Sequence, residues 1–165
     1  MNIYLIGFMG VGKTTIAKEL SKRLDYKLID TDNEIEARED RSISDIFESE
    51  GEEYFRGLER ELIRELSSKD NMIVSCGGGI IKCDENINLM RESGRVILLE
   101  ASPETIYDRV KDNNSRPLLQ ANPGIEGIKK LLREREEYYN KAYTDKIDSS
   151  RPVRMVVDDI IGVVH

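Results

Sequence analysis

Short apolar runs alternate with longer stretches of helical spacing along the chain. Runs of four or five residues with β-type composition predict strands at Asn2–Ile6, Lys27–Asp30, Asn71–Ser75, Val96–Glu100 and Lys146–Ser149. Apolar residues three and four apart predict helices over Lys13–Leu24, Asp32–Arg38, Ser44–Leu66 with an interruption at Gly51, Asn86–Arg91, Glu104–Lys111 and Ile125–Tyr143. This alternation is typical of an α/β fold of three layers, in which helices cover both faces of a parallel sheet.

The last segment of the chain, from Pro152 onward, is rich in valine and isoleucine, a composition that favours a strand. Most of its apolar residues nevertheless fall at positions 153, 156, 157, 160, 161 and 164, which is helical spacing. Proline also suits the first turn of a helix. We therefore predict a C-terminal helix.

Composition and charge narrow the class of protein. A chain of 165 residues with 39% hydrophobic and 35% charged residues is typical of one globular domain, here residues 1–165. It has no apolar run long enough for a transmembrane helix, and its apolar start lacks the basic leader of a signal peptide. Cys76 and Cys83 have no metal-type partners, so we expect free thiols and a cytoplasmic protein.

The net charge of −7 argues against a nucleic-acid partner, because such binders usually carry a basic surface. We likewise expect no membrane partner. An anionic ligand must therefore meet a local cluster of cations within an acidic protein.

The segment Gly7–Thr14, GFMGVGKT, fits the pattern G-x-x-x-x-G-K-[ST] between a predicted strand and a predicted helix. The glycines let successive backbone N–H groups turn inward around an anion, and the helix adds its positive N-terminal end. Lys13 can then reach the β- and γ-phosphates of a nucleotide, and the Thr14 hydroxyl can ligate Mg²⁺. A dinucleotide-binding loop would need a glycine where Thr15 stands, so we exclude it.

Among phosphate-loop proteins, a GTPase would carry an Asn-Lys-x-Asp segment late in the chain. The nearest string, Asn140–Tyr143, lacks the aspartate. A small kinase fits better, since 165 residues leave room for two substrate sites and a lid and for little else.

Two further strands are predicted to end in residues with candidate chemistry. Asp30 and Asp32 end the second strand, where ligands of parallel sheets bind, so one could order the waters of Mg²⁺ and the other contact an attacking hydroxyl. The plain alternative is that Asp32 only caps the next helix. Gly77–Gly79 follow the third strand and expose backbone N–H groups where a side chain would block a ligand; a plain turn is the alternative.

Three arginines stand out by their surroundings. Arg135 is flanked at helical spacing by two leucines and two tyrosines, so it points inward and needs an anionic partner, although a snorkelling arginine is the alternative. Arg133 lies on the solvated face of the same helix. Arg56 has glutamates around it at helical spacing, and this pattern alone predicts a surface ion-pair residue.

The long loop-like stretch Asp112–Gly127 contains Arg116. An arginine on such a loop suits a lid that closes over a transferring phosphate, but a lone loop arginine is ordinarily solvated. The pattern leaves both interpretations open.

Together these motifs resemble the shikimate kinase family along nearly the whole chain. The resemblance rests on the phosphate loop GFMGVGKTT, Asp30–Thr31–Asp32, Glu53–Tyr54–Phe55–Arg56, Gly77–Gly79, Arg116–Pro117–Leu118–Leu119, and Arg135 just before Tyr138–Tyr139. It implies a P-loop kinase fold with a five-stranded parallel sheet, a lid near residues 112–124 and a substrate-binding region near residues 32–62. It also implies transfer of the ATP γ-phosphate to the 3-hydroxyl of shikimate, a step of chorismate and aromatic amino-acid synthesis.

The resemblance also assigns roles. Catalysis would fall to Lys13, Asp32 and Arg116. ATP would be bound by Gly10, Val11, Gly12, Lys13, Thr14, Thr15, Arg109, Arg116 and Arg151. Shikimate would be bound by Asp32, Arg56, Gly77, Gly78, Gly79 and Arg135, and Mg²⁺ by Thr14 and, through water, by Asp30. The resemblance thus reverses the interpretation of Arg56 as a surface residue and favours the interpretation of Arg116 as a lid residue. We expect a monomer.

One residue departs from the family pattern, because Cys76 stands where a threonine is more usual; this removes a hydroxyl near the metal, though Ser75 is adjacent. Two alternative functions remain. A gluconate kinase has a related core and an acidic substrate that two arginines would also serve. A non-catalytic ATP-binding module is the other, and the intact set of Lys13, Thr14, Asp32 and Arg116 speaks against it. Nucleoside monophosphate kinases fit less well, because the lid stretch is short and poor in arginine.

Overall fold

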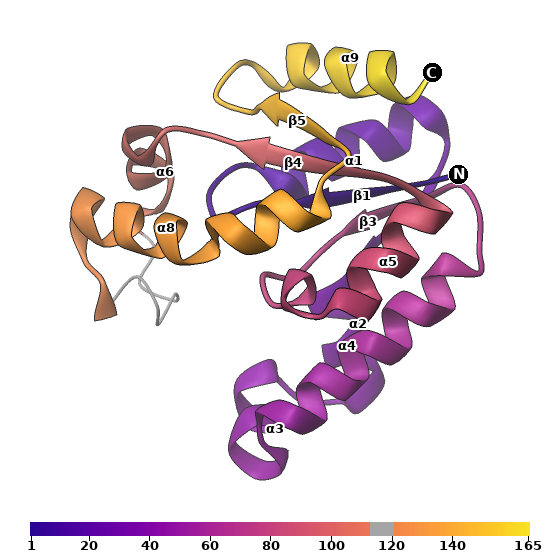
Figure 1. Cartoon of the computed structure of the whole chain (residues 1–165), viewed down its shortest axis with the longest axis vertical. Coiled ribbons are helices and arrows are strands. Elements are labelled where there is room, and N and C mark those ends of the chain that lie inside the picture. The colour runs from indigo at the N-terminus through magenta and orange to yellow at the C-terminus, as the bar shows by residue number, and fades with distance from the viewer. Residues whose placement is uncertain (113–120) are drawn as a thin grey trace.

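A parallel sheet forms the centre of the molecule, for which a computed structural model describes residues 1–112 and 121–165. The described strands are β1 (Asn2–Ile6), β2 (Lys27–Asp30), β3 (Met72–Ser75), β4 (Gly94–Glu100) and β5 (Asp145–Asp148). They lie in the order β2-β3-β1-β4-β5, and each neighbouring pair is parallel (Figure 1). The predicted α/β class and five-stranded parallel sheet are confirmed.

The described helices are α1 (Lys13–Leu24), α2 (Thr31–Glu39), α3 (Ile43–Glu50), α4 (Glu52–Ser67), the 3-10 turn η1 (Ile80–Lys82), α5 (Asp84–Ser93), α6 (Pro103–Val110), α8 (Gly124–Ala142) and α9 (Val153–Val164). The interruption predicted at Gly51 separates α3 from α4. The C-terminal helix is also confirmed, with Pro152 at its N-cap instead of in its first turn. The largest error in the strands is at β4, which begins two residues earlier than predicted because Gly94 pairs with Asn2.

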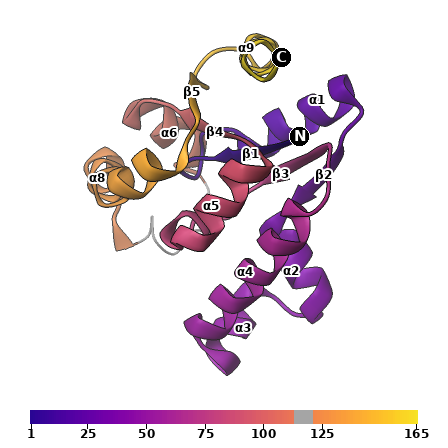
Figure 2. The same ribbon diagram turned by 45° about the vertical axis from the view of Figure 1, so that its right-hand side comes forward.

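Alternating residues of β1 supply both layers of the core, and all five of its residues are buried. Tyr4 and Ile6 face a cluster completed by α4, α5 and part of α8. Ile3 and Leu5 face the opposite cluster, which includes residues of α1 and α9. Figures 1 and 2 show α1 and α9 on one side of the sheet and α4 and α5 on the other. A central strand covered on both faces explains the nearly continuous apolar run at the N-terminus.

Helix α3 and the adjoining end of α4 project beyond the sheet (Figures 1 and 2). They are held together by Phe47 and Phe55, whose ring centroids are 5.0 Å apart. Arg41, between α2 and α3, adds ion pairs to Glu39 and Glu50. This arm carries one wall of the cleft described below.

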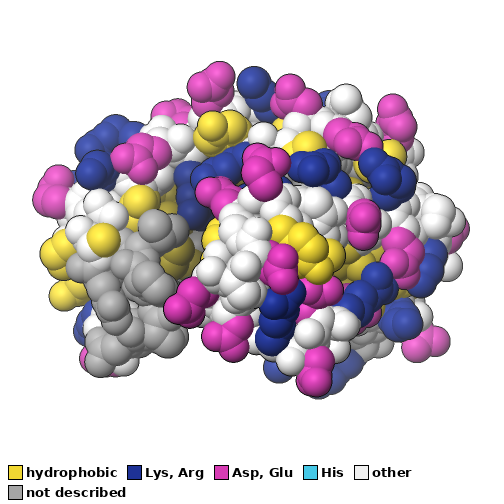
Figure 3. Space-filling view, turned by 90° about the horizontal axis from the view of Figure 1, so that it is seen from below, with side chains coloured by type: hydrophobic (Ala, Val, Ile, Leu, Met, Phe, Trp, Pro, Cys, Tyr) yellow, Lys and Arg dark blue, Asp and Glu magenta, His cyan; other side chains and the backbone are white. Residues whose placement is uncertain are grey.

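None of the described helices has the length and hydropathy needed to cross a membrane. On the face of the molecule seen in Figure 3, acidic and basic side chains are interspersed instead of gathered by sign.

Candidate active site

A cleft of about 760 Å³ opens at the carboxyl ends of β1, β2 and β3. This is where parallel sheets bind ligands, because the strand order reverses there and the loops diverge. The predicted residues that line it are Gly10, Gly12, Lys13, Thr14, Thr15, Asp30, Asp32, Arg56, Gly77, Gly78, Gly79, Arg109 and Arg135. The fold therefore brings most of the predicted site into one cavity. Two described members, Val11 and Arg151, are not part of its lining.

The phosphate loop follows β1 and curls back before α1. Gly10 and Gly12 have φ of 86° and 96°, a left-handed region that residues with a side chain rarely adopt. A Cβ on Gly10 would also lie 2.8 Å from Val110 of α6. The loop thus needs glycine for backbone conformation and for close packing, and it presents the N-terminus of α1 to the cleft.

Lys13, the first residue of α1, folds over this loop. Its Nζ donates to the carbonyl oxygens of Gly7 at 2.5 Å and Phe8 at 3.3 Å. The ammonium group is therefore held above the curl of amides, where a nucleotide phosphate would need positive charge. Thr14 and Thr15 follow it and are exposed to the cleft.

Asp30 at the end of β2 and Asp32 in α2 lie in different environments. Asp30 is the N-cap of α2 and its carboxylate accepts from the backbone N–H of Asn33 at 3.0 Å. The alternative that Asp32 caps this helix is therefore wrong, because Asp32 lies in the first turn. Burial, followed by the charges of Asp30 and Glu36, raises the pKa of Asp32, while Lys13 and Arg56 oppose the rise.

Each glycine of the 77–79 segment faces one predicted functional side chain. A Cβ on Gly77 would overlap the carboxylate of Asp32, and a Cβ on Gly79 would overlap the guanidinium of Arg56. A Cβ on Gly78 would lie 3.1 Å from Nη1 of Arg135. The plain-turn interpretation does not explain this arrangement, because none of the three glycines has a positive φ.

Arg56 makes the ion pairs that its sequence pattern predicted, yet it lies in the cleft. Its Nη1 is 2.6 Å from Glu59 Oε1 and its Nη2 is 3.3 Å from Glu52 Oε1. The surface part of the pattern-based interpretation is wrong, since the Arg56 side chain is only 23% exposed and lines the cavity.

Glu59 is the site residue that the sequence analysis missed. It is 1% exposed, and burial raises the pKa of its carboxyl, although Arg56 opposes that rise. A signal was present, because Glu59 lies one turn from Phe55 and from Leu62, on the apolar face of α4. A buried carboxylate in such a place needs a cation, and here the cation is Arg56.

Arg135 points inward from α8, as predicted, while Arg133 on the same helix is exposed. The Cζ atom of Arg135 lies 5.4 Å from the ring centroid of Phe8, a residue of the phosphate loop. This contact is within the range of a cation–π interaction. It places the candidate substrate arginine directly beside the candidate nucleotide loop.

The remaining predicted cations differ in position. Arg109 of α6 donates to the carbonyl oxygens of Gly10 and Ser149 at 3.1 and 3.0 Å, so it borders the phosphate loop. Arg151 instead pairs with Asp159 of α9 at 2.6 Å. Arg116, and most of the predicted lid, lie outside the described residues.

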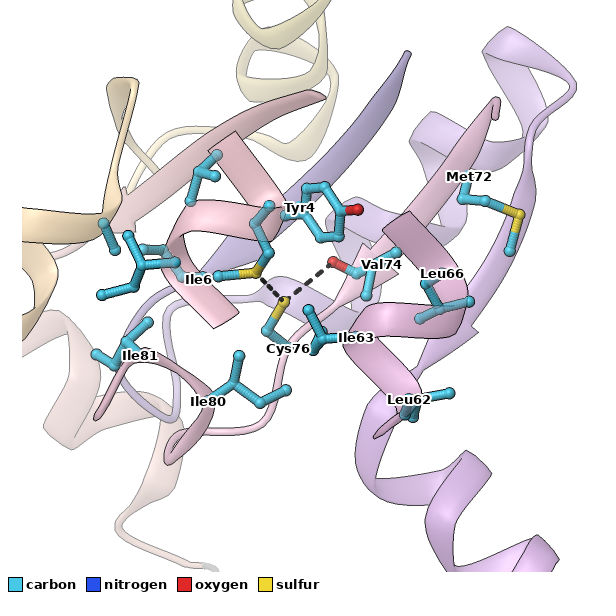
Figure 4. Packing of buried hydrophobic residues seen from close by; sticks show 14 of the residues in the cluster. Tyr4, Ile6, Leu62, Ile63, Leu66, Met72, Val74, Cys76, Ile80 and Ile81 are labelled. Carbon is cyan, nitrogen blue, oxygen red and sulfur yellow. Dashed lines mark hydrogen bonds between the residues drawn. The ribbon is translucent and has the colours of Figure 1, made fainter. Parts of the chain in front are cut away.

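The thiol of Cys76 points into the hydrophobic core, where it contacts other residues of the core cluster. Its Sγ lies 3.8 Å from the Val74 carbonyl oxygen and 3.9 Å from the Met90 sulfur (Figure 4). Burial raises the pKa of this thiol well above its usual range. Both cysteines are free, as predicted.

Oxygen ligands in the cleft suit a hard cation. Thr14 offers a hydroxyl, and Asp30 and Asp32 offer carboxylates, which are the donors that Mg²⁺ prefers. Within the described part of the chain, no group of three or more His, Cys, Asp or Glu side chains is arranged to hold a metal. This donor set fits a Mg²⁺ ion bound largely through substrate phosphates and water.

Comparisons with known proteins point to one family. The family model described as shikimate kinase matches residues 9–165. A shikimate kinase of Persephonella marina is 40% identical over 164 residues, with 99% of both chains covered. The solved shikimate kinase from Acinetobacter baumannii in complex with shikimate superposes with a TM-score of 0.89 at 32% identity, covering 99% of this chain and 92% of the other.

A gluconokinase from Sinorhizobium meliloti has a TM-score of 0.62 at 15% identity, covering 99% of this chain and 90% of the other. That likeness shows the shared P-loop kinase-like fold and nothing finer. The chain belongs to the shikimate kinase family and is an ATP-dependent small-molecule kinase.

Proposed function

We propose that this chain transfers the γ-phosphate of ATP to the 3-hydroxyl of shikimate, giving shikimate 3-phosphate and ADP, a step of chorismate and aromatic amino-acid synthesis. One observation carries the proposal. The phosphate loop, Asp32 and two arginines line a single cleft, so an anionic nucleotide and a small organic acid fit side by side.

The phosphate loop and its lysine form the nucleotide side. Backbone N–H groups of Gly10–Thr15 surround the ATP phosphates, and Lys13 lies against the β- and γ-phosphates. Thr14 would hold Mg²⁺ directly and Asp30 through a water, and the ion supplies charge neutralisation on the phosphates. Support for this assignment comes from the glycine conformations and from the position of Lys13 over the loop.

Arg56 and Arg135 form the acid side of the site, a clamp that binds the carboxylate of the substrate. A planar carboxylate matches the fork of a guanidinium group, and two forks from different helices fix the ring of the substrate in one orientation. Backbone N–H groups at Gly78 and Gly79 add donors, since these glycines face the two arginines. Asp32 then contacts the hydroxyls of the substrate.

In phosphoryl transfer the protein mainly positions the two substrates and neutralises the charge on the phosphates, and it forms no covalent bond itself. The ionised Asp32 accepts a hydrogen bond from the attacking hydroxyl and keeps the oxygen aimed at the γ-phosphorus. Its raised pKa makes it a better proton acceptor than an ordinary aspartate. Lys13 and the amides of the loop stabilise the charge that builds on the transferred group.

Four further expectations remain part of the proposal. Arg116 reaches the ATP phosphates from a lid near residues 112–124. The region near residues 32–62 binds shikimate. Arg109 and Arg151 contribute to the nucleotide site, and the position of Arg109 beside Gly10 supports its part. The protein is a cytoplasmic monomer that binds neither nucleic acid nor membrane.

The test measures ADP release with ATP and Mg²⁺ across shikimate, gluconate and nucleoside monophosphates. Turnover with shikimate is expected. Turnover with gluconate alone would replace the proposal by its first alternative, and no turnover with any acceptor would favour a non-catalytic ATP-binding module.

A pair of variants on α8 tests the acid side. Arg135→Ala should weaken shikimate binding about 10- to 100-fold and leave ATP affinity within about twofold, because a charge-assisted bidentate contact is lost. Arg133→Ala is the matched control, since Arg133 is exposed on the same helix. An equal loss of affinity for shikimate and for ATP in the Arg135→Ala variant would contradict the proposed role of Arg135 in binding the substrate carboxylate.

A further inference from the structure

The two arginines of the proposed clamp are held by different chemistry. Arg56 has carboxylate partners, Glu59 at 2.6 Å and Glu52 at 3.3 Å. Arg135 makes no ion pair with any carboxylate in residues 1–112 and 121–165. Its guanidinium lies over the face of Phe8, with Cζ 5.4 Å from the ring centroid. Among the described residues, therefore, no carboxylate fixes the orientation of the Arg135 guanidinium.

Tyr139 follows Arg135 by one helical turn and is 6% exposed. Its hydroxyl is shielded from solvent and makes no hydrogen bond of acceptable geometry with the described residues. Within those residues only one other buried side-chain polar atom, Asn86 Oδ1, is in this position. A buried hydroxyl without a partner is costly and calls for an explanation.

Arg135 is close enough to act on this hydroxyl. Burial raises the pKa of Tyr139, and the guanidinium of Arg135 opposes that rise. Residues four apart on a helix are neighbours, so the two groups are within reach of one another through a rotamer change. Hydrogen bonds in ligand-free sites are often poorly aligned and tighten when the ligand binds.

A neighbouring cavity does not satisfy the hydroxyl. Phe8 and Tyr139 both line a second cavity of about 250 Å³ beside β4 and α6. Because the hydroxyl oxygen has almost no accessible surface, water in that cavity does not reach it. Arg135 lines the first cavity and not the second, whereas Phe8 and Tyr139 line the second and not the first.

We propose that Tyr139 is the positioning residue of the clamp: in the substrate complex its hydroxyl accepts an N–H from Arg135 and fixes the guanidinium toward the carboxylate. A guanidinium has five N–H donors, and a bidentate carboxylate takes two of them. A phenol hydroxyl accepts one of the remaining donors without neutralising the charge, whereas Glu59 partly neutralises Arg56. This inference rests on the proposed function and adds a residue to it.

The test compares Tyr139→Phe with Tyr138→Phe. The control removes a hydroxyl from the adjacent residue of α8, a half-buried tyrosine packed against the same core cluster. Tyr139→Phe is expected to raise the KM for shikimate about tenfold, the effect of losing a hydrogen bond to a charged group. Its kcat and its KM for ATP should stay within about twofold of wild type, and Tyr138→Phe should match wild type throughout.

Thermal unfolding separates positioning from a structural role. Tyr139→Phe removes a buried polar atom that has no partner in the described chain, so its Tm should equal or exceed that of wild type. In an Arg135→Ala background, Tyr139→Phe should cause no further rise in KM, because its partner is gone.

An unchanged KM in Tyr139→Phe, or an equal rise in the Arg135→Ala background, would overturn the positioning role. Both outcomes assume that the wild-type protein phosphorylates shikimate. A wild-type protein without that activity would instead overturn the proposed function.

Discussion

The Gly79→Ala variant tests whether the glycine segment lacks side chains because the arginines of the clamp, Arg56 and Arg135, occupy the space beside it. Gly79 has φ −92° and ψ −8°, a conformation that alanine adopts without strain. A Cβ at this position would nevertheless overlap the guanidinium of Arg56, with Nη1 as the nearest atom and even Nη2 only 2.7 Å away. Since non-bonded atoms prefer roughly 3.5–4 Å, the guanidinium must move by about 1 Å or more.

The expected magnitude follows from the geometry of the fork. A shift of this size breaks the bidentate contact with a carboxylate held in place by Arg135. Hydrogen bonds to charged groups contribute about 1.5–3 kcal/mol, so the Kd for shikimate should rise about 10- to 150-fold. The far end of Arg56 is flexible, and alanine reduces the entropy of the unfolded chain, so the Tm should stay within about 4 °C of wild type.

Isothermal titration of each variant with shikimate, and separately with a non-hydrolysable ATP analogue, measures the effect. Gly57→Ala is the matched control, because it lies next to Arg56 on α4. A Cβ at Gly57 would meet only Arg60 Nη2, at an ordinary 3.8 Å. The control should bind shikimate normally and gain up to about 1 kcal/mol of stability from helix propensity.

A Gly79→Ala protein with wild-type affinity for shikimate would refute the argument, because the clamp would then not depend on the missing side chain. An equal loss of affinity for the ATP analogue would also refute it, since Arg56 would then not be specific to the acid side.

Four other variants probe charged groups, three of them in the cleft and one, Arg38, outside it. Lys13→Met should lower kcat by about 10²–10³-fold or more with the fold retained, because a preorganised donor to the transferred phosphoryl group is lost; ADP release and circular dichroism measure the two effects, and normal turnover would contradict the role. Asp30→Asn should shift the acid limb of the kcat/KM profile to lower pH, because the charge of Asp30 raises the pKa of Asp32; an unmoved limb would show that Asp32 does not control it. Asp32→Asn should lose activity yet stabilise the fold at pH 7, because a raised folded-state pKa makes the ionised form a cost that grows as pH rises through that pKa; chemical denaturation checks the sign. Arg38→Ala should cost about 0.5 kcal/mol at pH 7 without changing the KM for either substrate, since this exposed pair lowers the pKa of Glu65 to about 2. That cost should shrink as pH falls from the ordinary Glu65 value of 4.5 toward 2, and a pH-independent cost would contradict the ion pair.

Periodicity was enough to predict the fold because the signals are local. The buried run of β1, the glycine loop and the helix of Lys13 lie next to one another in sequence. The C-terminal helix was predictable against its composition, since the spacing of its apolar residues outweighs the β preference of valine.

The site was only partly predictable because its contacts join distant segments. Each glycine of 77–79 is matched to one side chain from α2, α4 or α8, and no local pattern contains that pairing. For the same reason Arg56 looked like a surface residue, and the burial of Glu59 went unnoticed. Whether Asp30 or Asp32 caps α2 depends on a helix boundary one residue from the predicted one. The spacing of apolar residues does not resolve so small a difference.

The most direct measurement of the central claim is ³¹P NMR of the protein with ATP, Mg²⁺ and shikimate. The account predicts loss of the ATP γ-phosphate signal and growth of one phosphomonoester signal, coupled to the proton on carbon 3 of shikimate. Growth of inorganic phosphate alone, or of a phosphomonoester only when gluconate replaces shikimate, would contradict it.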